Sequence, residues 1–252
     1  MRKSAGGLVL LALFALCGGM GMGHAAEATG RTITVAATER PVKLIAFVAP
    51  GTEPRPAALL LHGGNGFRNG LPGYSRYAAG LAASGVDAYL VYYYSDKDLR
   101  DRDSGVDNFY ERLPAWRKLV GDVATAVLQR EHASGKIGIV GFSNGAILGT
   151  AASGVDPRIG AFVGYYGAIP GPLARDITRM PPTLLLHGDN DQVIPFSAGQ
   201  ELEKFTRALN RDTEMVVYHG EGHGFATDEN NVGRNGLTRT IAFLKSRLAE
   251  KP

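Results

Sequence analysis

The sequence is short of the residues on which several large classes of chemistry depend. It contains one cysteine, Cys17, among 252 residues, and this cysteine lies in the apolar N-terminal segment. A disulfide within the chain and a metal site built from thiolates are therefore excluded. The sequence also has no GxxxxGK[ST] phosphate loop, no GxGxxG dinucleotide fingerprint and no Cys/His cluster of metal-binding spacing. We therefore expect neither a cofactor nor a metal ion.

An excess of charge of one sign is missing as well. The chain has 27 Lys and Arg against 24 Asp and Glu, a formal net charge of +3. Two of the basic residues, Arg2 and Lys3, lie in the N-terminal segment, and their removal would leave about +1. Nothing in this balance indicates a partner of high negative charge, so we expect no binding to nucleic acid and none to an anionic membrane surface.

The N-terminal segment is typical of an export signal. Two basic residues precede an apolar run, residues 8–16, which is too short to span a bilayer, and small residues follow it. We expect residues 1–26 to be a signal peptide cleaved near positions 25–28, where two sets of small residues offer alternative sites. The mature chain would then be periplasmic or secreted, without a stable membrane anchor. Lipidation of Cys17 is the less favoured alternative, because a large leucine precedes it.

The remaining residues, 27–252, alternate predicted strands with predicted helices. This pattern is typical of the α/β class, with a mostly parallel central sheet and helices on both faces, and the length suits a single domain. The charged segment 95–107 is predicted to be a solvated loop. Predicted strands cover residues 32–37, 42–48, 57–61, 87–94, 137–142, 159–165, 181–186 and 214–218, and predicted helices cover 74–84, 113–131, 197–210 and 237–248, with a further helix after Ser143.

The segment around which the chain is organised is 141–145, Gly-Phe-Ser-Asn-Gly, between a buried strand and a helix. A serine hydroxyl is a weak nucleophile until a sharp turn presents it to a base, and GxSxG supplies such a turn. Larger residues two positions before and after Ser143 would collide, which explains the flanking glycines. We therefore identify Ser143 as the candidate nucleophile and expect the N–H of Asn144 to donate to an oxyanion.

A second glycine-rich turn, residues 62–66, follows the buried strand 57–61. Its backbone can approach a ligand closely, so we expect it to supply the second oxyanion donor from Gly64 or Asn65. His62 is expected to support this loop rather than to ionise. Since loops at the carboxyl ends of strands line active sites, residues 92–94 and 108–110 are a candidate substrate wall. The side chains named as candidates for the substrate pocket are His62, Tyr92, Tyr94 and Phe142.

An acid and a base follow the serine, each just past the end of a predicted strand. Asp189 and Asp191 compete for the role of acid, and we favour Asp191 because Asp189 sits in the turn itself, where aspartate often bonds to backbone N–H groups. Among the later histidines, His223 lies between glycines in a loop and is the candidate base. His187 and His219 are expected to satisfy local backbone or packing. The histidine would accept the serine proton while the carboxylate holds its tautomer.

Taken together, the segments HGGNG, IGIVGFSNGA, FVGYYGA, LLLHGDNDQVIP and GEGHGF resemble the dienelactone hydrolase family of α/β-hydrolases. The resemblance runs from about residue 57 to the closing helix. It implies Ser143 as nucleophile, Asp191 as acid, His223 as base and an oxyanion donor at Asn144. In founding members of the family the elbow holds a cysteine and the oxyanion loop a glutamate, whereas this chain has Ser143 and His62-Gly63-Gly64. These departures favour a serine carboxylesterase over an enzyme for dienelactone.

The leading functional hypothesis is therefore hydrolysis of a small-molecule ester through an acyl-enzyme. A peptidase or an acyltransferase could use the same triad, and the SNG elbow is also similar to polyester depolymerases and feruloyl esterases. From a different class, the chain could be a catalytically silent scaffold that binds a ligand. The acyl group, the alcohol and the oligomeric state stay open.

Overall fold

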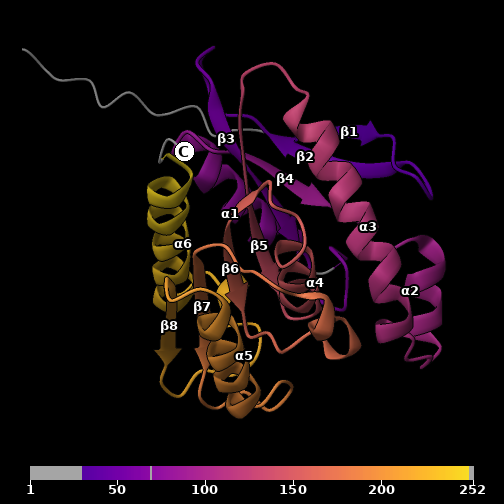
Figure 1. Cartoon of the computed structure of the whole chain (residues 1–252), viewed down its shortest axis with the longest axis vertical. Coiled ribbons are helices and arrows are strands. Elements are labelled where there is room, and N and C mark those ends of the chain that lie inside the picture. Colours follow the sequence, from indigo (N-terminus) through magenta and orange to yellow (C-terminus); the bar gives the residue numbers. More distant parts are fainter. Residues whose placement is uncertain (1–29, 69, 250–252) are drawn as a thin grey trace, which may run out of the picture.

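A computed structural model of the chain describes residues 30–68 and 70–249 (Figure 1). The predicted signal peptide, its cleavage sites and Cys17 lie outside the described residues. Strands and helices alternate from β3 onward. The strands are β1 (Arg31–Val35), β2 (Val42–Phe47), β3 (Arg55–Leu61), β4 (Asp87–Val91), β5 (Ala133–Phe142), β6 (Ile159–Tyr165), β7 (Thr183–Gly188) and β8 (Thr213–Tyr218). The helices are α1 (Leu71–Ala83), α2 (Asp96–Asp103), α3 (Phe109–Leu128), α4 (Asn144–Ser153), α5 (Phe196–Leu209) and α6 (Asn231–Ala249), with short 3₁₀ turns η1 (Gly171–Asp176) and η2 (Phe225–Thr227).

The strands form one eight-stranded sheet in the order β1-β2-β4-β3-β5-β6-β7-β8. The hairpin of β1 and β2 is antiparallel and joins the sheet antiparallel to β4, whereas β4, β3, β5, β6, β7 and β8 run parallel. The carboxyl ends of the parallel strands therefore meet at one edge, which is where ligand sites of such sheets lie. This architecture confirms the predicted fold class.

Alternating side chains of the central strands fill two cores, one on each face of the sheet. In β3, Leu59 and Leu61 point into a core shared with α3, α4 and α5, whereas Ala58 and Leu60 point into a core shared with α1 and α6. Both faces of these strands are thus buried, which explains why their sequences are continuously apolar. The two helical layers on either side are visible in Figure 1.

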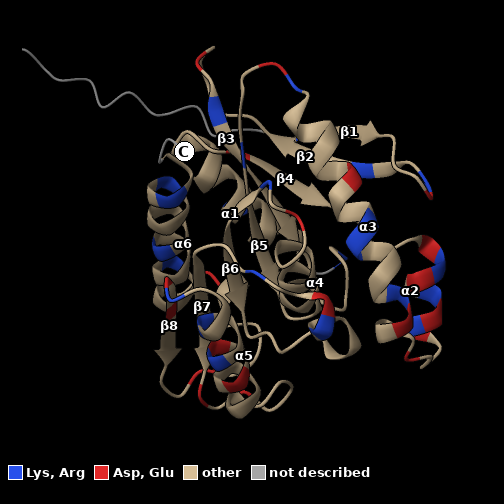
Figure 2. Cartoon of the chain, in the orientation of Figure 1, with Lys and Arg blue, Asp and Glu red and all other residues tan. Residues whose placement is uncertain are grey.

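The prediction of a solvated loop over residues 95–107 is wrong, because residues 96–103 form α2. The helix begins with a capping box in which the Ser95 hydroxyl accepts the N–H of Asp98 and the Asp98 carboxylate accepts the N–H of Ser95. Figure 2 shows how densely charged α2 is. One of these charges is not solvated, since Asp98 is buried and accepts hydrogen bonds from Arg112 and Trp116 of α3. These contacts hold α2 against the end of α3.

The predicted strand over residues 87–94 ends earlier, at Val91. Beyond it the chain turns, and Tyr93 and Tyr94 become buried side chains at the edge where the parallel strands end. In the described part of the chain, no helix combines the length and apolarity needed to cross a membrane.

Candidate active site

Ser143 lies at the junction of β5 and α4 in a strained backbone conformation. Its φ is 55° and its ψ is −120°, a region that a residue with a side chain rarely occupies. The N–H of Ser143 donates to the carbonyl of Tyr165 in β6, and its own carbonyl accepts the N–H groups of Ala146 and Ile147. The turn is therefore held from both sides, and such an elbow lifts the hydroxyl clear of the backbone.

The glycines on either side of this turn are required by close approach. A side chain at Gly141 would overlap the carbonyl of Gly145, as the sequence predicts, but one at Gly145 would overlap the carbonyl of Leu61 at the end of β3. The elbow is thus packed directly against the neighbouring strand, and a methyl group at Gly145 would push Ser143 and the glycine-rich loop 62–66 apart.

We expect Gly145→Ala to lower the free energy of unfolding by about 2 kcal/mol or more, because rigid backbone must move to admit the new methyl group. Gly121→Ala is the matched control. It also adds a methyl group to a helix, but the nearest atom there, Nη2 of Arg158, is 3.9 Å away. That variant should be stabilised by about 0.5–1 kcal/mol. Urea unfolding measures both changes, and equal stabilities of the two variants would contradict the packing argument.

The structure brings Ser143, His223 and Asp191 into one chain of hydrogen bonds. Nε2 of His223 lies 2.9 Å from Oγ of Ser143, and Nδ1 of His223 lies 2.7 Å from Oδ2 of Asp191. The other oxygen of Asp191 accepts the N–H groups of Val193 and Ile194 at 2.8 and 2.9 Å. Asp191 is 4% exposed. A carboxylate fixed in this way keeps the proton of the imidazole on Nδ1 and leaves Nε2 free to accept the serine proton.

The competing residues have other partners. Asp189 pairs with His219 at 2.7 Å near the surface and accepts the N–H of Gly220 at the same distance. Both interactions lower the pKa of the Asp189 carboxyl, the bond to His219 more strongly. Nε2 of His187 donates to the carbonyl of Ile194 at 2.9 Å, and burial lowers the pKa of this histidine. His187 therefore helps to fix the loop that carries Asp191, and it is Asp191, not Asp189, that lies against His223.

His62 fixes the orientation of the glycine-rich loop 62–66. Its Nδ1 lies 2.8 Å from the carbonyl of Gly63, which also accepts the N–H of Gly66 at 3.1 Å. In a trans peptide the C=O and N–H point in opposite directions, so the N–H of Gly64 is directed away from the buried His62. Gly64 lines the cavity that contains Ser143. The backbone N–H groups of Gly64, Asn65 and Asn144 find no acceptor among the described residues, and Asn65 lines the same cavity as Gly64. The direction of the peptide between Gly63 and Gly64 is the reason to prefer Gly64 as the candidate donor.

Burial of His62 should make the protein less stable in acid. The ring stacks on Tyr93 at 4.0 Å between centroids, and burial lowers its pKa from 6.5 to about 4. Below pH 6.5, His62 binds a proton in the unfolded chain but stays neutral in the folded chain. Stability is therefore fully present above pH 6.5 and falls as the pH drops toward 4, by about 3 kcal/mol for this one group.

Urea unfolding between pH 7 and pH 4.5 measures this loss, with His62→Gln as the comparison. We expect the free energy of unfolding of His62→Gln to fall less steeply with acid than that of the wild type, because the variant lacks the buried imidazole of residue 62, whereas His187, whose pKa burial also lowers, is present in both proteins. Parallel curves would contradict the assignment.

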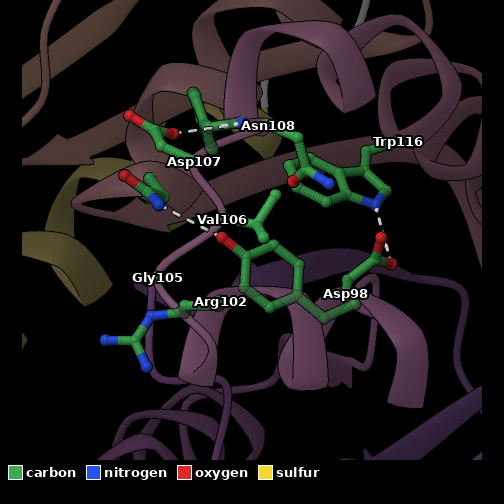
Figure 3. A pocket seen from close by; sticks show the side chains of 10 residues that line it. Asp98, Arg102, Gly105, Val106, Asp107, Asn108 and Trp116 are labelled. Atoms are coloured by element: carbon green, nitrogen blue, oxygen red, sulfur yellow. Dashed lines mark hydrogen bonds between the residues drawn. The ribbon is translucent and has the colours of Figure 1, made fainter.

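Two cavities flank the elbow. The first, which we call the serine cavity, has a volume of about 280 Å³ and contains Ser143 and His223 together with the glycine loop, Tyr74, Tyr166, Gly224 and Thr227. The second, the aromatic pocket (Figure 3), has a volume of about 320 Å³, and Asn144 forms part of its wall. The aromatic pocket is lined by Tyr94, Val106, Phe109 and Trp116, with Asp98, Arg102, Gly105, Asp107 and Asn108 completing its wall.

Only one of the four named pocket candidates lines either cavity. Tyr94 lines the aromatic pocket, and its hydroxyl accepts from Nδ2 of Asn144 at 3.1 Å. His62 and Phe142 are buried, the latter stacked on Tyr165, and Tyr92 packs against Phe67. The candidate wall at 108–110 contributes Asn108 and Phe109. Sequence reasoning missed the role of α2 in this pocket, although the spacing of Ser95 and Asp98 is a helix-capping signal.

Within residues 30–68 and 70–249, no group of three or more His, Cys, Asp or Glu side chains is arranged to hold a metal ion.

Residues 76–245 match the family described as "Dienelactone hydrolase family". The chain belongs to the dienelactone hydrolase family. A Yersinia pestis protein named "Putative carboxymethylenebutenolidase" is 28% identical over 143 residues, which cover 52% of this chain and 54% of that protein. An Escherichia coli protein of the same name is 28% identical over 99 residues, 36% of each chain. The chain thus spans about half or less of the length of these curated relatives.

Solved structures of this family and of esterases share the fold. Dienelactone hydrolase from Anabaena variabilis superimposes with a TM-score of 0.72 at 16% identity, covering 88% of this chain and 99% of that one. An esterase from Thermogutta terrifontis, solved with propionate bound, superimposes with a TM-score of 0.67 at 16% identity, covering 88% and 97%. At these identities the similarity establishes the architecture alone.

Proposed function

We propose that this member of the dienelactone hydrolase family is a serine carboxylesterase that works through an acyl-enzyme. The observation that supports this most directly is the continuous line of hydrogen bonds from Asp191 through His223 to a strained Ser143. Beside that line, the N–H groups of Asn144 and Gly64 are without acceptors in the described part of the chain. A nucleophile, a base with a fixed tautomer and an oxyanion hole are the parts that acyl transfer requires.

In the proposed mechanism the Ser143 oxygen attacks the ester carbonyl carbon while Nε2 of His223 takes the serine proton. The carbonyl oxygen becomes an oxyanion that the N–H groups of Asn144 and Gly64 stabilise. The bond to the alcohol oxygen then breaks, and His223 returns the proton to that oxygen. A water molecule, activated by His223, releases the acid by the reverse sequence. Asp191 keeps its negative charge throughout and stabilises the imidazolium.

The proposed substrate is a small-molecule ester. The cavities of about 280 and 320 Å³ on the two sides of the elbow can hold the two halves of such a molecule. The site of action, periplasmic or secreted, is proposed from the N-terminal sequence alone.

Hydrolysis of p-nitrophenyl acetate, butyrate and octanoate tests the proposal, and a serine-reactive fluorophosphonate probe adds an independent readout. We expect turnover of at least the short esters and stoichiometric labelling of Ser143, located by mass spectrometry of the digested protein. A protein that neither hydrolyses any of the three esters nor labels would be a silent scaffold. A protein that labels but prefers amides or transfers the acyl group to an added alcohol would be a peptidase or an acyltransferase.

A further inference from the structure

The O–H of Tyr74 can donate a hydrogen bond that no group in the described part of the chain accepts. Tyr74 lies on α1, and its oxygen accepts the N–H of Gly63 at 3.1 Å. Its own O–H has no acceptor among the described residues. The ring is held in place by edge-on contacts with Phe67 and Phe142, at centroid distances of 5.0 and 5.1 Å. The hydroxyl is therefore fixed in position, with a proton that is free to bind something outside the fold.

This hydroxyl lies on the wall of the serine cavity, close to the nucleophile. The point that a side chain at Gly63 would occupy is 3.4 Å from Cβ of Ser143 and 3.6 Å from the Tyr74 hydroxyl oxygen. Because residue 63 is glycine, no side chain separates the two groups. Tyr74 and His223 both line the same cavity. A substrate attached to Ser143 therefore has part of its surface within reach of Tyr74.

The arrangement of the other donors indicates which part of the substrate that is. In the proposed mechanism the carbonyl oxygen is held by the backbone N–H groups of Asn144 and Gly64, and Asn144 also lines the aromatic pocket. The alcohol oxygen must face Nε2 of His223, which returns the proton to it. Tyr74 lines the same cavity as His223. We therefore expect the alcohol half of the ester to lie against the Tyr74 hydroxyl. Burial raises the pKa of Tyr74, which keeps the hydroxyl protonated.

We propose that Tyr74 is a further catalytic residue, whose O–H donates a hydrogen bond to the leaving alcohol oxygen; this inference rests on the proposed esterase function. When the bond between the carbonyl carbon and this oxygen breaks, the electron pair stays on the oxygen. The proton comes from His223, and Tyr74 stabilises the developing negative charge while keeping its own proton. Such help matters most for strongly basic alkoxides, so the inference assigns esters of alkyl alcohols to this enzyme as well as aryl esters.

Tyr74→Phe removes the hydroxyl and keeps the ring. We would measure kcat/KM, which reports acylation, for p-nitrophenyl, phenyl and ethyl acetate, three esters with the same acyl group and increasingly basic leaving groups. We expect a loss of about 10- to 100-fold for ethyl acetate and of less than about 3-fold for p-nitrophenyl acetate, because p-nitrophenolate leaves without assistance. Tyr77→Phe is the matched control, since it removes a buried hydroxyl from the same helix that bonds to Tyr165 instead. It should lower all three values equally or not at all.

The result separates the possible roles. An equal loss for all three esters would overturn the inference and leave Tyr74 with the single task of holding Gly63, because a displaced oxyanion loop slows every ester. No loss would overturn it as well. A wild-type protein without activity on any ester would instead overturn the proposed function, and the inference with it. Thermal melting of both variants shows that each is folded.

Discussion

Replacement of Ser143 by alanine is expected to lower kcat for short p-nitrophenyl esters by about 10⁴-fold or more. The serine oxygen is the proposed nucleophile that bonds to the carbonyl carbon. Without it, neither His223 nor the oxyanion hole can form the acyl-enzyme. What stays is the stabilisation of a direct attack by water, which accounts for the residual rate of such variants. The alanine keeps the unusual φ of 55° without adding bulk, so the fold should survive.

Ser153→Ala provides the matched control. Ser153 lies at the other end of the same helix, α4, is buried, and its hydroxyl has no hydrogen-bond partner among the described residues. Its removal should leave kcat unchanged. Steady-state kinetics with p-nitrophenyl acetate, together with loss of fluorophosphonate labelling in Ser143→Ala alone, measure the difference. A Ser143→Ala protein that keeps a tenth of the wild-type activity would show that another residue is the nucleophile.

The sheet and the loops that follow β3, β5, β7 and β8 were predictable because both depend on local sequence. Continuous apolar runs such as that in β3 mark strands buried on both faces, and GxSxG between such a strand and a helix marks the elbow. The chain order of Ser143, Asp191 and His223 could be read in the same way, since each follows the end of a strand. The side chains then meet because the carboxyl ends of parallel strands share one edge of the sheet.

The features that the sequence did not predict depend on partners distant in the chain. The charge density of α2 indicates solvent, but Arg112 and Trp116 of α3 bury its Asp98. Phe142 precedes the nucleophile and was named as a pocket residue, yet it points into the core that α1 and α6 cover. Which face of a strand end opens to a cavity is decided by the helices packed against it, and a linear pattern does not contain that information.

Asp191→Asn and Asp189→Asn should differ by about three orders of magnitude in activity, although both change one carboxylate to an amide in the same loop. In Asp191→Asn the amide oxygen can keep the N–H groups of Val193 and Ile194, which turns the NH₂ group toward Nδ1 of His223. The histidine must then accept at Nδ1 and carry its proton on Nε2, where it cannot take the serine proton. A wrong tautomer of this kind lowers kcat by about 10⁴-fold.

Asp189→Asn loses a pair with the exposed His219 and one bond to the N–H of Gly220, both of which an amide oxygen can partly replace. Surface pairs of this kind contribute little to stability, so the loop that carries Asp191 should keep its position. We therefore expect less than a 10-fold change in kcat. The two variants measured side by side with p-nitrophenyl acetate at pH 7.5 decide between the aspartates. Equal losses would mean that the hydrogen bond between Asp189 and His219, which joins the two loops, holds His223 against Ser143, and that the charge of Asp191 does not.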